Sequence, residues 1–192
     1  DPRRLAAGYL RAAVARGTRV YAPVEVSEIR ATRRGVEAGT KSGPVVRCEA
    51  LVYATGYEMP KAVRTRNHQI HSTWAIATRP QPRALWPTRC FIWEAASPYL
   101  YLWAGPNGEV ICGGEDEEFS DEEKRDGLSA AKFAAIEEKL ARLLPGIDAR
   151  PVYTWCGTFG GSATGTPSIG PVPRMNSIVF SSILSLGSSI RW

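Results

Sequence analysis

Cysteine and histidine are scarce in this chain, and their spacing excludes the sites they most often build. The 192 residues contain four cysteines, far apart and without a C-x-x-C pair: Cys48, Cys90, Cys112 and Cys156. Structural zinc sites and thiol redox motifs need closer clusters. We therefore expect no metal, and four small buried cysteines in a reducing compartment. We expect His68 and His71 to be surface residues of a crossover segment, with a general base as the alternative.

Long apolar runs are also absent. No run approaches the roughly 18 residues that a membrane-spanning helix needs. We expect Asp1-Pro2-Arg3-Arg4 to lead into an amphipathic helix and expect no signal peptide. An apolar content of 44% nevertheless suffices for a folded core. We expect a cytoplasmic protein with no membrane partner.

Charge of either sign is moderate and scattered. The net charge is +5, and the densest basic cluster, Arg30, Arg33 and Arg34, adjoins a predicted turn. Nucleic-acid binding needs a basic face with interleaved aromatics, so a solvated turn is the favoured interpretation and no nucleic-acid partner is expected. The acidic run from Glu115 to Glu123 precedes a helix, whose N-terminus favours carboxylates, so it indicates helix entry over a metal site.

The first half of the chain has the pattern of a helix followed by antiparallel strands. Apolar residues at helical spacing predict a helix of about four turns that ends at Gly17. A short strand is predicted over 18–21. Strands over 24–31, 35–40 and 45–54, separated by turn residues, predict a three-stranded meander.

The second half predicts a sheet with an aromatic side. Strands are expected over 72–78, 91–94, 99–103, 110–114 and 151–159, with Pro106-Asn107-Gly108 as a hairpin turn. Alternation puts Tyr99, Tyr101 and Trp103 on one face, with Leu100 and Leu102 on the other.

A long helix is expected to cover this sheet. The spacing of Ser120 and Glu123 is that of a capping box, and the apolar stripe behind it ends before Pro145-Gly146. The fold class is therefore α+β: an antiparallel-rich sheet covered by a long helix, plus a small meander.

Two sets of residues resemble a known family. A strand that ends in Ala54-Thr55-Gly56 resembles the A-T-G element of flavoproteins with two dinucleotide-binding domains. Downstream, the order of Trp93-Glu94, Gly113-Gly114-Glu115-Asp116 and Trp155-x-Gly157…Gly165-x-Pro167-x-Ile169-Gly170 is similar to the D-amino acid oxidase and glycine oxidase superfamily of FAD-dependent oxidoreductases. The resemblance runs from about Asp1 to Pro173.

The resemblance implies FAD as the cofactor of the intact family member. The positions it implies for cofactor binding are Val24, Val26, Ala54, Thr55, Gly56, Trp155, Gly157, Gly165, Pro167, Ile169 and Gly170. The expected substrate wall is Tyr99, Tyr101, Trp103 and Phe159, with core filling by the same aromatics as the alternative. Flavin carries out the difficult chemistry, so we assign no catalytic acid or base.

Three departures from the family pattern limit these expectations. The G-x-G-x-x-G turn that places pyrophosphate on a helix N-terminus is missing. The Gly-rich closing loop and helix are replaced by a serine-rich tail over 174–192. The arginine that pairs with a substrate carboxylate in glycine oxidase-like members corresponds to Phe159. We expect a truncated fragment that binds FAD poorly and is inactive alone.

The predicted organisation and function follow from the resemblance. Residues 1–71 would be a partial FAD-binding domain, 72–173 a substrate-binding domain, and 174–192 a remnant of the FAD-binding domain. The parent enzyme would oxidise an amine or amino-acid-like CH–NH donor by hydride transfer to flavin. One alternative is a non-catalytic module that binds no FAD and forms a homo-oligomer through apolar edges. Another is a nucleic-acid-binding domain, suggested by a pI of 9.2.

Overall fold

The computed structural model describes residues 2–56, 60, 63, 68–162, 166, 168–172 and 175–182. The elements are α1 (Pro2–Ala15), β1 (Val26–Thr32), β2 (Gly35–Thr40), β3 (Val45–Cys48), β4 (Leu51–Tyr53), β5 (His68–Thr78), β6 (Ile92–Trp93), β7 (Leu100–Ala104), β8 (Val110–Glu117), α2 (Glu122–Leu143), β9 (Pro151–Ser162), β10 (Ser168–Val172) and β11 (Met175–Ser182). The chain divides into two compact units, Asp1–Val52 with Pro173–Val179 and Tyr53–Val172 with Phe180–Trp192. Each unit is described by itself.

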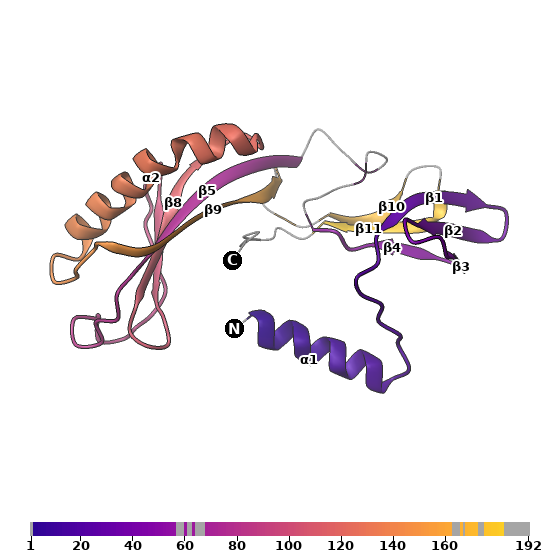
Figure 1. Ribbon diagram of the computed structural model, residues 1–192, viewed down its shortest axis with the longest axis horizontal. Helices are drawn as coiled ribbons and strands as arrows, with labels where there is room; N and C mark the ends of the chain where they lie inside the picture. Colours follow the sequence, from indigo (N-terminus) through magenta and orange to yellow (C-terminus); the bar gives the residue numbers. More distant parts are fainter. Residues whose placement is uncertain are drawn as a thin grey trace. The chain divides into compact units, whose positions relative to one another are not determined.

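The predicted meander is confirmed in the first unit, where three strands form an antiparallel sheet in the order β1-β2-β3 (Figure 1). Val36 and Ala38, two residues apart on the central strand, are buried on one side of it. Gly35 begins this strand with φ +140°, and a Cβ there would collide with the carbonyl oxygen of Cys48. The close approach of the strands at this point therefore requires glycine.

Two expectations for this half of the chain are wrong in detail. Residues 18–21 form no strand, because they are exposed and pair with no other strand of the described chain. The strand expected over 45–54 is interrupted at Glu49-Ala50. Its first part, β3, pairs with β2, whereas β4 joins β10 and β11 in a separate sheet of order β10-β11-β4. The first helix is confirmed and is followed by Gly17 at φ +92°.

The second unit contains the predicted antiparallel sheet and its covering helix. Five strands lie in the order β6-β7-β8-β5-β9, and α2 packs against β5, β8 and β9 (Figure 1). Trp74, Leu102 and Leu140 are completely buried in the core between the sheet and the helix. The α+β fold class is confirmed, and one face of this sheet lies opposite α2.

The helix α2 begins one residue later than the capping-box pattern indicates. Asp121, not Ser120, is the N-cap, and its Oδ1 accepts a hydrogen bond of 2.8 Å from the Lys124 backbone N–H. An aspartate at this position also places negative charge where the helix dipole favours it. Farther along, Ile136 and Leu140 are fully buried, as the apolar stripe predicted.

Three further expectations need correction. His68 and His71 are half-buried residues of β5, not surface residues of a crossover, because β5 begins four residues earlier than expected. Glu115 belongs to β8, so only the end of the acidic run enters the helix. All four cysteines are free, but Cys112 alone is buried and Cys90 is exposed.

Two absences hold for the residues described above. No helix among them is long and apolar enough to cross a membrane. Within the same residues, no group of three His, Cys, Asp or Glu side chains is arranged to hold a metal ion.

Candidate functional site

The face of the five-stranded sheet opposite α2, here called the aromatic face, carries most of the residues expected to form the site. Register alone defines a row that crosses all five strands: Trp93, Tyr101, Gly113, Ala75 and Trp155 are successive cross-strand partners. Since side chains alternate along a strand, all members of this row lie on the same face. The row combines large rings at both ends with small residues in the middle.

Aromatic rings gather on the β6 and β7 side of this face. Tyr101 and Trp103 stack with ring centroids 6.1 Å apart at 12°, and Phe91 stacks on both. The intervening Leu100 and Leu102 are buried on the opposite face, against the core. The alternation predicted for this strand is therefore confirmed.

Gly113 allows Tyr101 to lie across the neighbouring strand. A Cβ at Gly113 would lie 2.5 Å from both the Cζ and the hydroxyl oxygen of Tyr101. Burial raises the pKa of Tyr101 above its ordinary value. The phenol therefore remains protonated near neutral pH and presents a flat ring and a hydroxyl to this face.

Tyr99 and Asp116 form the most polar contact of the aromatic face. The Tyr99 hydroxyl donates a short hydrogen bond to Oδ2 of Asp116, and the other carboxylate oxygen, Oδ1, is buried. Burial, together with the adjacent Asp116 carboxylate, holds the pKa of Tyr99 well above its ordinary value. Tyr99 is therefore a hydrogen-bond donor, not a proton acceptor, across the physiological range.

Charges on the α2 side of the sheet are already paired. Lys132 lies 2.8 Å from Glu117 and donates to the backbone carbonyl of Glu115 at 2.9 Å, and Lys139 is ion-paired with the Glu115 side chain. Glu115 is 7% exposed and has φ +57°, which turns its carboxylate toward these two helix lysines. The Lys132 ion pair lowers the pKa of Glu117.

The far edge of the aromatic face is formed by β9. Phe159 is a cross-strand partner of His71, and their rings stack with centroids 5.1 Å apart at 16°. Gly157 precedes it on the same face, opposite Thr73. Strands β7 and β9 are separated by β8 and β5, which at the usual strand spacing puts Trp155, the β9 residue in the row of Tyr101, about 14 Å from Tyr101. Phe159 lies four residues farther along β9, so it is about 19 Å from Tyr101.

The predicted site residues fall into three groups. The aromatic face brings together Tyr99, Tyr101, Trp103, Trp155, Gly157 and Phe159. Val24 and Val26 lie at the start of the meander, Ala54, Thr55 and Gly56 follow β4, and Ile169 and Gly170 lie in β10. Gly165 and Pro167 lie outside the described residues.

Trp93 and Asp116 of this face were not among the predicted site residues. The register of β6 against β7 pairs Trp93 with Tyr101, and the same alternation argument extended by one strand would have found it. Asp116 was hidden because we assigned the acidic run to helix entry.

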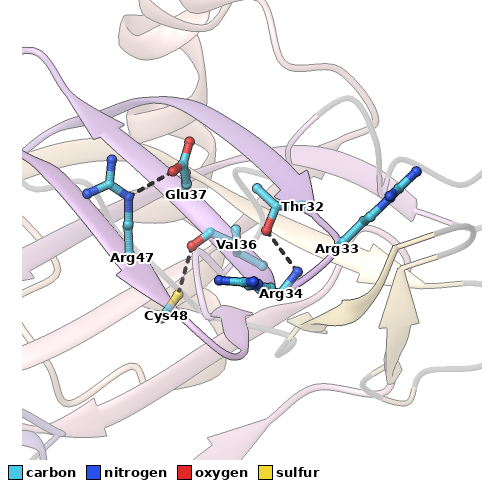
Figure 2. A pocket seen from close by; sticks show the side chains of 7 residues that line it. All are labelled: Thr32, Arg33, Arg34, Val36, Glu37, Arg47 and Cys48. Carbon is cyan, nitrogen blue, oxygen red and sulfur yellow. Dashed lines mark hydrogen bonds and ion pairs between the residues drawn. The ribbon is translucent and has the colours of Figure 1, made fainter.

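A separate hollow lies in the meander of the first unit (Figure 2). Its volume is about 460 Å³, and it is lined by Thr32, Arg33, Arg34, Val36, Glu37, Arg47 and Cys48. Arg47 is paired with Glu37 at 2.8 Å, and Arg33 points away from the other labelled side chains in Figure 2. None of the residues predicted to bind cofactor or substrate lines this hollow.

Comparisons with known proteins place this geometry in context. A family model described as FAD dependent oxidoreductase matches residues 1–187. No curated protein matches the chain. Among solved structures, glycine oxidase from Geobacillus kaustophilus is similar at 18% identity and a TM-score of 0.68, over 89% of this chain and 45% of that one.

Two further solved structures support the same fold. NikD, described as an unusual amino acid oxidase essential for nikkomycin biosynthesis, is 16% identical with a TM-score of 0.71, over 91% of this chain and 50% of its own. Iminodiacetate oxidase from Chelativorans sp. BNC1 is 19% identical with a TM-score of 0.66, over 94% and 48%. This chain thus spans about half the length of the structures that it resembles.

Proposed function

Because the chain belongs to the FAD-dependent oxidoreductase family, we propose that it carries the substrate wall of an enzyme that oxidises an amine or amino-acid-like CH–NH donor. In this proposal, residues 72–173 are the substrate-binding domain, and residues 1–71 and 174–192 belong to the FAD-binding domain. The observation that carries the proposal is the aromatic face, in which a row from Trp93 to Trp155 crosses the sheet opposite its covering helix.

The residues of the aromatic face suit a flat ring and a small donor beside it. Ala75 is a small residue in the middle of the face, whereas the Tyr101 side chain lies over Gly113 on one side of it and Trp155 lies on the other. Rings and small residues also exclude water from a bound donor carbon. Bound FAD would supply the hydride acceptor.

Several backbone positions are proposed to hold the cofactor. Gly56 has φ +65°, and a Cβ there would meet nothing within 4 Å. Glycine is therefore favoured at this position by the backbone conformation and not by a lack of space for a side chain. Val24 and Val26 are about half exposed, which leaves their main chain within reach of an adenine ring. With no G-x-G-x-x-G turn in the sequence, these residues fit the ends of FAD better than its pyrophosphate.

The proposed donor does not depend on a carboxylate clamp at Phe159. A phenyl ring stacked on His71 offers no guanidinium to pair with an α-carboxylate. We therefore propose that Tyr99, Tyr101 and Trp103 orient the donor through ring contacts and the Tyr99 hydroxyl.

The test begins with cofactor binding. FAD is added to the purified chain, free flavin is removed by gel filtration, and bound flavin is measured by absorbance. If flavin is retained, amines and amino acids are added without oxygen, and bleaching of the flavin bands identifies donors. Retention followed by bleaching with an amine supports the proposal. The non-catalytic module is favoured if this chain retains no flavin and also retains none when it is combined with a separately expressed nucleotide-binding half of a relative.

A further inference from the structure

Strand β8 contains a β-bulge between Gly114 and Glu117. The neighbouring strand β5 spans the same interval from Trp74 to Ser72, so β8 has one residue more than β5 over this stretch. Bulges of this kind turn a side chain toward a different face of the sheet, and they occur often beside active sites. The side chains that this bulge redirects are those of the two residues between Gly114 and Glu117.

The bulge exchanges the sides on which Glu115 and Asp116 lie. In a regular strand, Glu115 would lie on the aromatic face together with Gly113, and Asp116 would lie on the side of α2. The observed contacts are the reverse. The Glu115 side chain is ion-paired with Lys139 of α2, whereas Asp116 accepts the hydrogen bond of the Tyr99 hydroxyl. The bulge therefore brings a carboxylate to the aromatic face, where it meets Tyr99.

Two features of this bulge are energetically unfavourable. Glu115 has φ +57°, a left-handed conformation that costs energy in any residue with a Cβ. The Oδ1 atom of Asp116 is buried and has no hydrogen-bond partner among the described residues. Arrangements of this kind persist only where the surrounding structure holds them in place. Contacts from outside the two residues must therefore stabilise the bulge.

Two lysines of α2 supply these contacts. Lys132 donates a hydrogen bond of 2.9 Å to the backbone carbonyl of Glu115, and this carbonyl belongs to the peptide that leads into the next residue of the bulge. Lys139 is ion-paired with the Glu115 side chain and donates to the carbonyl of Pro98 at 3.4 Å. Pro98 and Glu115 immediately precede the tyrosine and the aspartate that meet on the aromatic face. Because Glu115 is only 7% exposed, water screens these contacts little.

We infer that Glu115, Lys132 and Lys139 are positioning residues. They hold the bulge from the α2 side of the sheet, and in this way they keep Asp116 bonded to the Tyr99 hydroxyl on the other side. The orientation of Tyr99 thus depends on two lysines that its side chain never touches. That Tyr99 in turn orients the oxidised donor rests on the proposed function, whereas the positioning of Tyr99 does not.

A pair of variants at one position tests whether the bulge conformation positions Tyr99. Glu115→Ala and Glu115→Gly both remove the carboxylate, but glycine adopts a left-handed φ freely and alanine does not. The readout is the hydroxyl proton of Tyr99 in proton NMR at neutral pH, since a hydrogen bond to a carboxylate shifts this proton downfield and slows its exchange with water. Tyr99→Phe assigns the signal. We expect exchange about tenfold faster in Glu115→Ala than in the parent, and exchange near the parent rate in Glu115→Gly.

A second pair of variants tests the lysines. Lys139→Met removes the ammonium group but keeps a side chain of similar length, and it should also speed exchange of the Tyr99 hydroxyl proton about tenfold. The control is Lys124→Met, the same change on the same helix at a lysine that lies over the Phe119 ring instead of contacting Glu115. It should leave the exchange rate unchanged.

Folding of every variant is verified by circular dichroism and by its unfolding midpoint, and Lys139→Met decides the outcome if Glu115→Ala does not fold. Equal exchange rates in Glu115→Ala and Glu115→Gly would overturn the inference. A parent rate in Lys139→Met, a raised rate in Lys124→Met, or no such hydroxyl signal in the parent would overturn it as well.

These measurements need no flavin, so they fail independently of the proposed function. In the flavin-loaded chain, Glu115→Ala should lower kcat/KM for an amine about tenfold, and Glu115→Gly should restore most of it. The expected exchange rates without any flavin reduction by amines would leave the positioning of Tyr99 standing and refute the proposed activity. Amine oxidation that is equally fast in Glu115→Ala and the parent would refute the dependence of the donor on these residues and leave the activity standing.

Discussion

Gly113 and Gly114 are adjacent glycines whose replacement by alanine should have unequal effects. At Gly114, φ is +141° and a Cβ would overlap the backbone carbonyl oxygen of Tyr99 on the neighbouring strand. That carbonyl also accepts the Glu115 N–H at 3.4 Å, so it cannot move without disturbing the β7–β8 pairing. At Gly113, the new Cβ would meet only the far end of the Tyr101 side chain.

The expected magnitudes follow from these contacts. Backbone strain at a positive φ costs about 1–3 kcal/mol, and overpacking against immovable backbone costs about 1–3 kcal/mol more. We therefore expect Gly114→Ala to lower the free energy of unfolding by about 3–5 kcal/mol. Gly113→Ala should lower it by about 1–2 kcal/mol, because the ring of Tyr101 can rotate away.

Urea denaturation followed by circular dichroism measures both values under one set of conditions. Gly127→Ala is the control: it lies at an exposed position in the second turn of α2, where a Cβ would meet nothing within 4 Å, and it should stabilise the helix by about 0.5–1 kcal/mol. A free energy of unfolding for Gly114→Ala within about 1 kcal/mol of the parent value, or a larger loss for Gly113→Ala than for Gly114→Ala, would contradict this account of the two glycines.

Three further outcomes are expected. Asp121→Ala should lower the free energy of unfolding by about 1 kcal/mol through loss of the N-cap, whereas Ser120→Ala should leave it unchanged, and urea denaturation of the pair decides between the two caps. Iodoacetamide at pH 8 should label the exposed Cys90 quickly in the native protein but spare the buried Cys112. Burial raises the pKa of the Cys112 thiol to about 12, which leaves roughly 1 thiol in 10,000 ionised at this pH. Peptide mass spectrometry that finds Cys112 labelled before Cys90 would contradict this prediction. Folding raises the pKa of Tyr99, so the contribution of Tyr99 to stability is complete below the ordinary tyrosine pKa of about 10 and is lost as the pH rises through the pKa of the folded state. Tyr99→Phe should therefore remove tyrosinate absorbance only from the last phase of an alkaline titration. Loss of absorbance from an early phase would contradict the raised pKa of Tyr99.

The sequence was most informative where a pattern is local and repeated. Alternation of Tyr99, Tyr101 and Trp103 with Leu100 and Leu102 was enough to separate the two faces of the sheet, because the strand period fixes the side of every residue. The meander was equally readable from its turn residues, and the long helix from its apolar stripe.

The pairing of distant strands could not be predicted from the sequence. The strand expected over 45–54 is divided because β4 finds its partner in β11, more than one hundred residues away, and no local pattern encodes that choice. His71 was expected at the surface because its segment was predicted to be a crossover. Its contact with Phe159 joins two distant strands, so no local pattern around His71 indicates it. Asp116 was assigned to helix entry together with the rest of the acidic run. The bulge between β5 and β8 near Ser72 and Trp74, where the register changes, has no local signal in the sequence.

The position of β5 in its sheet has a consequence for biosynthesis. This strand emerges from the ribosome first among the five, yet it lies between β8 and β9, which are made later. The edge of β5 at His68 is paired only after Ser162, its partner on β9, has been synthesised. Until then the nascent chain exposes an unpaired edge and the apolar side chains of Trp74 and Ile76, which is the state in which chains associate with one another and in which chaperones bind.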